Sequence, residues 1–292
     1  MKRAALVLVT ALAAPAWLAA QTPVDQTRPA APDGAVNIEN MSGTVKVTGW
    51  DRAEVQVKGT VGHGAELAFD GTEKRTRIEV EAEHGNPMGI KSDLDIYVPA
   101  GSSVSVEGFQ ATITVAGVTG SVKAETVNGS ISQTGAAKGI DLQSVNGTID
   151  STKAGGRVHA EAVNGTVTVR DASGEIEAST VNGKLLVTGG SFDQARLETV
   201  SGTVRFESAL SARATLSVES VSGSVDLFLP AAFGAEFSIS TFSGEITNEL
   251  GPAAEKANRW TPQKELSFTV GSGGARVTAE TLSGAINIRK RP

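Results

Sequence analysis

The stretch from Val122 to Val187 repeats one short motif, and this repetition decides the fold. The four copies are Val127-Asn128-Gly129-Ser130-Ile131, Val145-Asn146-Gly147-Thr148-Ile149, Val163-Asn164-Gly165-Thr166-Val167 and Val181-Asn182-Gly183-Lys184-Leu185. Their glycines recur every 18 residues. A fixed period of about this size is typical of repeat architectures, in which each unit stacks on the one before it.

The motif continues outside this stretch with serine in place of asparagine. The further copies are Met41-Ser42-Gly43, Val200-Ser201-Gly202, Val221-Ser222-Gly223, Phe242-Ser243-Gly244 and Leu282-Ser283-Gly284. After Gly183 the steps between glycines are 19, 21, 21 and 40 residues. We interpret the last step as about two coils, with an irregular segment at residues 251–265.

Apolar and polar positions alternate within every repeat. The apolar positions lie six and four residues before the Asn or Ser and three residues after it. In the central copies they are Val122, Ile140, Val158 and Ile176, then Ala124, Leu142, Ala160 and Ala178, then Ile131, Ile149, Val167 and Leu185. The position between the first two sets is polar, for example Lys123 and Asp141. This alternation predicts strands with one face inward and one face outward.

We predict two short strands per repeat, such as 140–145 and 148–151, with the Asn-Gly pair as the turn between them. Gly takes positive φ without steric cost, and Asn tolerates it better than most residues. Stacked Asn side chains would also form an amide ladder, each bonding the next coil. The predicted turn and ladder residues are Asn128, Gly129, Asn146, Gly147, Asn164, Gly165, Asn182, Gly183, Ser201, Gly202, Ser222 and Gly223.

These patterns predict an all-β chain, a single-stranded parallel β-helix with about 18–21 residues per coil. Asn-Gly between apolar runs is also a strong hairpin signal, so a meander of hairpins is the rival architecture. We favour the β-helix because the same residue types recur in coil after coil, and parallel stacking places them about 4.8 Å apart. Residues 36–103 lack the strict register and are predicted to form an irregular β-rich part that caps or flanks the coils.

The N-terminus indicates an exported protein. Lys2 and Arg3 precede the apolar run Ala4 to Leu18, so we predict a signal peptide at residues 1–20. Residues 21–35 are rich in Pro and Ala and are predicted to be a flexible leader. Residues 36–292 are then one β-solenoid domain. No second apolar segment of spanning length follows, so we expect no membrane span in the mature chain and a periplasmic or extracellular location.

Composition removes several classes of function. The chain has no Cys, which excludes disulfides, thiolate metal sites and a Cys nucleophile. The net charge of −6 argues against nucleic acid as the main partner. The common hydrolase, NTPase and dinucleotide-binding motifs are absent from the sequence.

The motif [Val/Leu/Phe]-[Asn/Ser]-Gly-x-[Ile/Val] resembles that of a bacterial domain with β-strand repeats described as a "putative adhesin". The strands ending Tyr97-Val98-Pro99 and Phe228-Leu229-Pro230 add to the resemblance, which covers roughly residues 36 to 290. The resemblance implies a single-stranded β-helix in an exported or envelope protein. No catalytic residues come with the family pattern.

One column of the repeat is rich in carboxylates. Three residues before the Asn or Ser it holds Glu39, Glu125, Gln143, Glu161, Ser179, Glu198, Glu219, Ser240 and Glu280. Stacked carboxylates could bind Ca²⁺ or act as a catalytic pair. We favour a solvated outer face, because Gln143 and the two serines dilute the like-charge repulsion. The Asn row could likewise form a carbohydrate-binding edge, but we favour the structural ladder.

The remaining candidates are interpreted as structural. His63, His84 and His159 are scattered, and we expect plain surface roles for them. Trp50, Phe109 and Trp260 lie outside the columns and could stack on a sugar, but we favour loop packing. We predict no catalytic site, no metal site and no cofactor.

The sequence therefore predicts a non-catalytic, adhesin-like structural or interaction protein of the cell envelope. Its polar faces would bind an envelope protein or glycan. A carbohydrate-active enzyme on a β-helix is one alternative, and a component of envelope-stress sensing is another.

Overall fold

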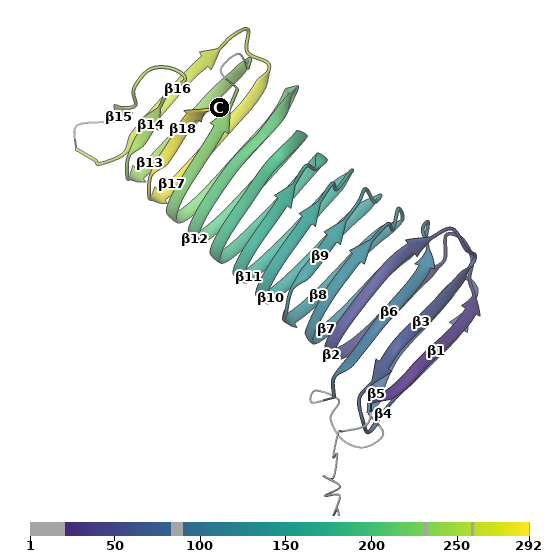
Figure 1. Ribbon diagram of the computed structural model, residues 1–292. Helices are drawn as coiled ribbons and strands as arrows, with labels where there is room; N and C mark the ends of the chain where they lie inside the picture. Colours follow the sequence, from purple (N-terminus) through teal and green to yellow (C-terminus); the bar gives the residue numbers. More distant parts are fainter. Residues whose placement is uncertain (1–20, 83–89, 231–232, 258–259, 292) are drawn as a thin grey trace, which may run out of the picture.

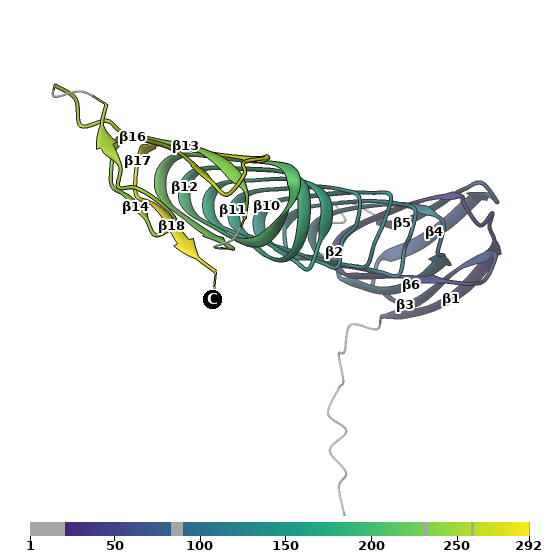
Figure 2. The ribbon, with the colours of Figure 1, turned by 90° about the horizontal axis from the view of Figure 1, so that it is seen from above.

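The computed structural model describes residues 21–82, 90–230, 233–257 and 260–291. The predicted signal peptide and His84 lie outside these ranges. The described chain is all β, and its strands form one 18-stranded sheet without a helix. Figures 1 and 2 show an elongated molecule in which the strands are stacked along one axis. No helix of the described part is long and apolar enough to cross a membrane.

The middle of the molecule is parallel and in register. It comprises β7 (Ser103–Ala116), β8 (Ser121–Asn128), β9 (Ile131–Thr134), β10 (Gly139–Thr152), β11 (Arg157–Arg170) and β12 (Ser173–Leu229). Equal positions of successive repeats pair, so Asn146 lies opposite Asn164 and Asn164 opposite Asn182. Each repeat thus contributes one layer of the stack, which we call a rung.

The chain bends at the motif without leaving the sheet. In β10 the side chains of Leu142 and Ser144 are buried, Val145 and Asn146 are exposed, and Ile149 is buried again. The alternation shifts by one residue at the bend, which turns the strand from one face of the rung to the other. Two separate strands joined by a turn were expected here. That expectation is wrong for β10 and β11, because each is a continuous strand through its Asn-Gly pair.

At the N-terminal end the order of rungs differs from the order of the sequence. The strands here are β2 (Ala35–Trp50), β3 (Glu54–Val61), β4 (Ala65–Thr72), β5 (Arg75–Ala82) and β6 (Ser92–Pro99). β2 pairs in parallel with β7 on one side and with β5 and β6 on the other. β4 pairs antiparallel with β5, and β3 antiparallel with β6. The irregular N-terminal part therefore closes this end of the stack with antiparallel strands.

The predicted leader at residues 21–35 is wrong in its first half, because β1 (Thr22–Pro29) pairs antiparallel with β3. β1 is the last strand on its side of the sheet. Pro23 and Pro29 cannot donate to a ladder, but an edge strand with one free side tolerates them. The Pro-rich composition therefore marks an edge strand, and it also discourages pairing with another chain.

At the C-terminal end, too, the order of rungs differs from the order of the sequence. Its strands are β13 (Ala235–Ser243), β14 (Ile246–Asn248), β15 (Glu255–Lys256), β16 (Lys264–Val270), β17 (Ala275–Ser283) and β18 (Ile286–Lys290). β17 pairs in parallel with both β12 and β13, so the last motif copy lies between the two copies that precede it. The interpretation of the 40-residue step as two further coils is wrong. The chain passes outward, forms the antiparallel pair β13–β16, and returns to fill the gap.

The apolar columns form the core. The columns that include Ile140, Leu142 and Ile149 are buried along the rod. Larger rings fill the C-terminal half: Phe192 contacts Phe206, and Phe237 stacks on Phe268 with ring centroids 4.5 Å apart. The prediction of an all-β chain is confirmed. The sheet is mixed rather than wholly parallel, because both ends fold back as antiparallel strands.

Candidate functional site

The asparagines of the central rungs form a hydrogen-bonded row on the outside of the bend. Asn146 Nδ2 donates to Asn128 Oδ1 at 3.0 Å, and Asn164 Nδ2 donates to Asn146 Oδ1 at 3.0 Å. Asn182 continues the row with a bond of 3.1 Å to Asn164. Each inner asparagine both donates and accepts, so its amide is engaged within the row. The asparagine row therefore has a structural role, because its hydrogen bonds join neighbouring rungs.

Beside the asparagines, the glycines bring neighbouring rungs unusually close. A Cβ atom on Gly147 would lie 1.7 Å from the carbonyl oxygen of Gly129, and one on Gly165 would lie 1.7 Å from that of Gly147. We expected positive φ to explain these glycines. That reason holds for Gly183 and Gly223, whose φ angles are 156° and 146°, but it is wrong for Gly129, Gly147, Gly165 and Gly202, which do not adopt the positive φ that favours glycine. Glycine is required there because the backbones approach too closely for any side chain.

The residue before each Asn or Ser points outward and forms an exposed apolar row along the bend. The members of the apolar row are Met41, Phe109, Val127, Val145, Val163, Val181, Val200, Val221, Leu282 and Phe242, in the order of the rungs. Six of them, Val145, Val181, Val200, Val221, Phe242 and Leu282, are 38% to 55% exposed. Large apolar side chains rarely line up in contact with solvent unless they serve an interaction.

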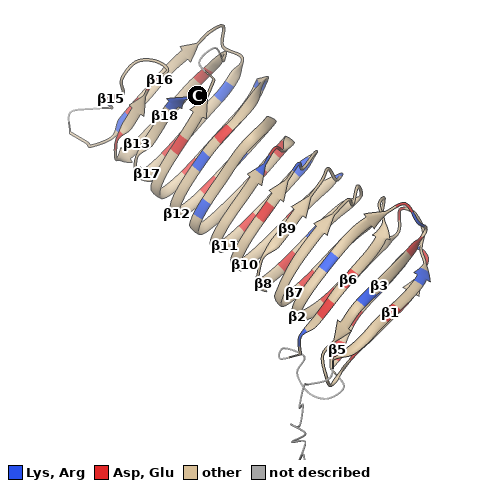
Figure 3. Ribbon diagram, in the orientation of Figure 1, with Lys and Arg blue, Asp and Glu red and all other residues tan. Residues whose placement is uncertain are grey.

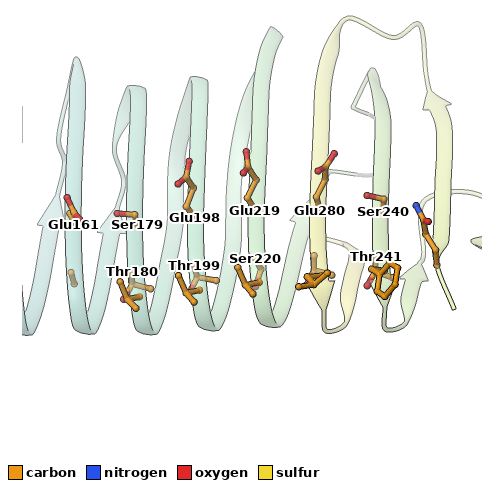
Figure 4. Close-up of a pocket in the computed structure, with 18 residues that line it drawn as sticks. Glu161, Ser179, Thr180, Glu198, Thr199, Glu219, Ser220, Ser240, Thr241 and Glu280 are labelled. Carbon is orange, nitrogen blue, oxygen red and sulfur yellow. The ribbon is translucent and has the colours of Figure 1, made fainter. Parts of the chain in front are cut away.

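Two residues before the apolar row lies a second outward column, the acidic row. Its members are Glu39, Glu107, Glu125, Gln143, Glu161, Ser179, Glu198, Glu219, Glu280 and Ser240. Figure 4 shows part of this row on successive strands, with Glu280 between Glu219 and Ser240. The carboxylate column predicted from the sequence is thus an outer face, and it runs beside a row that the sequence analysis did not single out.

The two rows enclose a shallow groove in two adjoining parts. One part, of about 580 Å³, runs from Glu161 to Phe242 and Leu282. The other, of about 380 Å³, runs from Met41 and Phe109 to Val163. Both parts include Glu161, so the groove follows the bend along most of the rod.

The floor of the groove is a column of small residues. Most are Thr or Ser: Thr126, Ser144, Thr180, Thr199, Ser220, Thr281 and Thr241, with Ala162 among them. Thr126 Oγ1 donates to the carbonyl oxygen of Ala111 at 3.2 Å. The hydroxyls of Ser144, Thr180, Thr199, Ser220 and Thr281 are buried without a hydrogen-bond partner. A buried hydroxyl without a hydrogen-bond partner lowers stability. The small residues at these positions are therefore explained by how they pack at the bend and not by hydrogen bonds of their hydroxyls.

Basic residues engage part of the acidic row. Lys123 Nζ lies 2.7 Å from Glu125 Oε1, and this hydrogen bond raises the pKa of Lys123. Arg196 is bonded to Glu198 and lies 3.6 Å from Glu219, and the Glu198 bond raises the pKa of Arg196. No Lys or Arg in the described part of the chain pairs with Glu107 or Glu280. Figure 3 shows acidic and basic positions on neighbouring strands along the rod.

The histidines and aromatic residues take varied places. His159 faces Glu161 and Glu177 at 3.9 and 3.7 Å on the outer face, and His63 is an exposed loop residue. Trp50, the last residue of β2, stacks on Tyr97 of β6 with centroids 5.2 Å apart, and its Nε1 donates to the carbonyl oxygen of Glu54. Trp260 is 87% exposed.

Phe109 corrects the sequence interpretation. It does not lie outside the columns, because β7 forms a full rung in register with β2. In that rung Gln110-Ala111 stands in place of the Asn-Gly pair, so the motif does not reveal this copy of the repeat in the sequence. The apolar row had a signal in the sequence, since the first residue of every motif copy is apolar although, except for Ala162 before Val163, its neighbours are polar.

Among the described residues, no group of three or more His, Asp or Glu side chains is arranged to hold a metal ion. The carboxylates of the acidic row lie one to a rung, and the residues that face them are Lys123, His159 and Arg196. This arrangement can attract and position a cationic group along a line. It offers no pair of carboxylates from one rung.

The model of one protein family, described as Toastrack DUF4097, matches residues 34–289. The chain belongs to this family. The match confirms the family resemblance inferred from the motif. The match begins just before β2 and ends within β18, so in this Toastrack chain it covers the groove and leaves out β1. No curated protein matches the chain.

Solved structures from three bacteria are similar to this Toastrack chain. A protein described as a putative adhesin from Parabacteroides distasonis is 7% identical, with a TM-score of 0.47, and 92% of this chain and 98% of that one are covered. One so described from Bacteroides fragilis is 8% identical, with a TM-score of 0.39 and the same coverage. One described as a putative cell adhesion protein from Clostridium sporogenes is 11% identical, with a TM-score of 0.24, covering 92% of this chain and 100% of that one.

Proposed function

We propose that this chain is a non-catalytic, adhesin-like interaction protein of the cell envelope, built on a single-stranded parallel β-helix. The parallel pairing of equal positions from β7 to β11 supports the β-helix. Membership of a Toastrack family, for which the motif carries no catalytic residues, supports a role in binding. Its partner would be an envelope protein or glycan that lies along the rod.

The observation that carries this proposal is the exposed apolar row. Six large apolar side chains stand in line between Val145 and Phe242, each more than a third exposed, and half-buried Val163 fills the remaining rung of this span. An apolar surface with polar borders is the usual mark of a recognition surface on a soluble protein. The row is also continuous, so a partner that follows the rod axis can contact several rungs at once.

A photo-crosslinking experiment tests binding. A photoreactive amino acid placed at Val200 in the full chain, expressed in a Gram-negative host, should form adducts with one envelope component. The same amino acid at Lys184, which lies past the bend, serves as the control. Absence of adducts from Val200, together with measurable turnover of an envelope polysaccharide by the purified chain, would replace binding by carbohydrate-active catalysis.

Export is tested separately by fractionation of cells that express the full chain with a C-terminal tag. The apolar run after Lys2 and Arg3 supports export, so the processed chain should appear in the periplasmic or surface fraction. Full recovery of unprocessed chain from the cytoplasm would remove the envelope from the proposal.

A further inference from the structure

The groove places two different chemistries side by side over many rungs. One wall is the apolar row, and the other is the acidic row, whose carboxylates include Glu161, Glu198, Glu219 and Glu280. Arg196 pairs with both Glu198 and Glu219 and so balances one of their two negative charges, whereas no described Lys or Arg pairs with Glu280. An occupant that satisfies both walls needs a continuous apolar stripe with positive charge along one side of it.

The negative charge of the acidic row favours some candidate occupants of the groove over others. A second copy bound face to face about a twofold axis would place each acidic row either against the other acidic row, which is repulsive, or against the other copy's apolar row, which buries carboxylates without partners. An anionic membrane surface would meet the same carboxylates and be repelled. A cationic partner gains from them, so charge complementarity favours a basic segment of another protein.

The spacing of the rungs indicates the conformation of that segment. Rungs of a parallel sheet lie about 4.8 Å apart, and an α-helix rises about 5.4 Å per turn. A helix laid along the groove therefore presents about one turn to each rung. An extended strand repeats its side chains about every 6.8 Å and would lose register within two rungs.

The length of the groove fits a helix of ordinary size. The part from Glu161 to Ser240 follows six successive members of the acidic row, in the order of Figure 4. Five steps of about 4.8 Å give roughly 24 Å, which about 16 helical residues would span. The accumulated mismatch of about 3 Å is within the reach of a Lys side chain.

We propose that this groove binds a cationic amphipathic helix of a partner protein. Apolar side chains of the helix rest on Val181, Val200, Val221 and Phe242, and Lys or Arg on one flank meets Glu198, Glu219 and Glu280. This proposal rests on the proposed interaction function and names the chemistry of the partner segment.

A labelled synthetic peptide of about 18 Leu and Lys residues, patterned as an amphipathic helix, is the probe. Its binding to residues 21–292 is measured by fluorescence anisotropy. A peptide of the same composition in scrambled order keeps the charge but has no apolar stripe, and a Leu–Glu peptide keeps the stripe but reverses the charge. The patterned Leu–Lys peptide should bind about tenfold or more tightly than either, and less tightly as salt is added.

Two double variants test the two walls. Glu198→Gln with Glu219→Gln, and Val200→Ser with Val221→Ser, should each weaken binding about tenfold. The matched control is Glu175→Gln with Glu177→Gln, which removes the same charge from the same outer face outside the groove and should change binding less than about twofold. All six side chains are partly or fully exposed, so the variants should keep the wild-type melting temperature.

Equal binding of the scrambled peptide, or equal loss in the control variant, would show only general charge attraction and overturn the proposal. Self-association of the wild-type chain that the Val200→Ser, Val221→Ser variant abolishes would assign the groove to a second copy instead. If the peptide does not bind but Val200 crosslinks to an envelope component, the helix proposal fails and the proposed function stands. If the peptide does not bind and Val200 forms no crosslink, the helix proposal and the proposed function both fail.

Discussion

Gly147 shows how a single residue is fixed by the distance between rungs. A Cβ atom there would lie 1.7 Å from the carbonyl oxygen of Gly129, an overlap with backbone that no rotamer can relieve. Gly139 starts the same strand, β10, and a Cβ atom there meets nothing within 4 Å. The two glycines therefore separate the effect of close approach from the general cost of replacing glycine.

We predict that Gly147→Ala lowers the free energy of unfolding by about 3 kcal/mol or more, since the rungs must move apart. Gly139→Ala should change it by less than about 0.5 kcal/mol. Urea titrations followed by circular dichroism measure both. Similar midpoints for the two variants would mean that the glycine row is not held by close approach.

The buried hydroxyls on the groove floor give a second comparison. Thr199 Oγ1 has no hydrogen-bond partner, whereas Thr126 Oγ1 donates to Ala111. Thr199→Val should therefore raise the free energy of unfolding by about 1 kcal/mol, because it removes an unsatisfied polar group at nearly constant shape. Thr126→Val loses a bond and should be neutral or destabilising. If Thr199→Val lowers the free energy of unfolding as much as Thr126→Val does, the Thr199 hydroxyl has a hydrogen-bond partner.

At the residue scale, the sequence predicts the Asn and Gly columns but not the reason for the glycines. Asn-Gly is a turn signal, and it suggested positive φ at Gly147. The structure needs glycine for a contact between residues 18 apart, which a local rule cannot describe. The acidic column was also readable from the sequence. The groove was not, because it depends on Val145 and its equivalents facing outward after the bend.

At the scale of elements, β2 and β5 place two carboxylates in adjacent strands. Glu39 lies opposite Glu79 in the parallel register. Burial raises the pKa of Glu79, the charge of Glu39 raises it further, and Arg77 opposes both effects. Because its pKa is raised in the folded chain, protonated Glu79 favours folding, and that contribution is lost as the pH rises through the folded pKa.

Glu79→Gln should therefore be more stable than the wild type at neutral pH, and this advantage should shrink to nothing below the ordinary glutamate pKa of 4.5. Melting temperatures from pH 3 to pH 8 give the comparison, in steps of about half a pH unit. Glu66→Gln, on the neighbouring strand β4, is the control. An advantage that grows toward low pH would have the wrong sign and contradict the raised pKa.

The end elements show the limit of reading a repeat along the sequence. Residues 103–116 form a rung although they lack the Asn-Gly pair, and Thr22–Pro29 form a strand although they are rich in proline. The last motif copy has the right residues, but its position in the stack follows from the pairing of β17 with β12 and β13. Periodicity predicts which residues build a rung. The order of rungs depends on how each end is closed.

At the scale of the whole molecule, stability is expected to be local. A rung contacts mainly its neighbours, so a stack of rungs behaves almost as a one-dimensional array. A destabilising change at one end therefore has little effect on the stability of distant rungs. Phe268 in β16 stacks on Phe237 in β13, with ring planes 7° apart, and this contact joins the terminal antiparallel strand to the stack. Phe192 and Phe206 form a tilted ring pair within β12, with centroids 6.2 Å apart, in the interior of the rod.

We predict that Phe268→Ala costs roughly 2–3 kcal/mol and that the loss is confined to the C-terminal end. Amide hydrogen exchange should quicken in β13 and β16 and stay unchanged in β10 and β11, because intact rungs separate them. Phe192→Ala removes a ring from the middle of the stack, so exchange should quicken within β12 itself and in the rungs that adjoin it. Faster exchange throughout the chain in Phe268→Ala would mean that the rod unfolds as one cooperative unit. A ligand bound along the groove would then stabilise every rung together, whereas local unfolding confines its protection to the rungs that it covers.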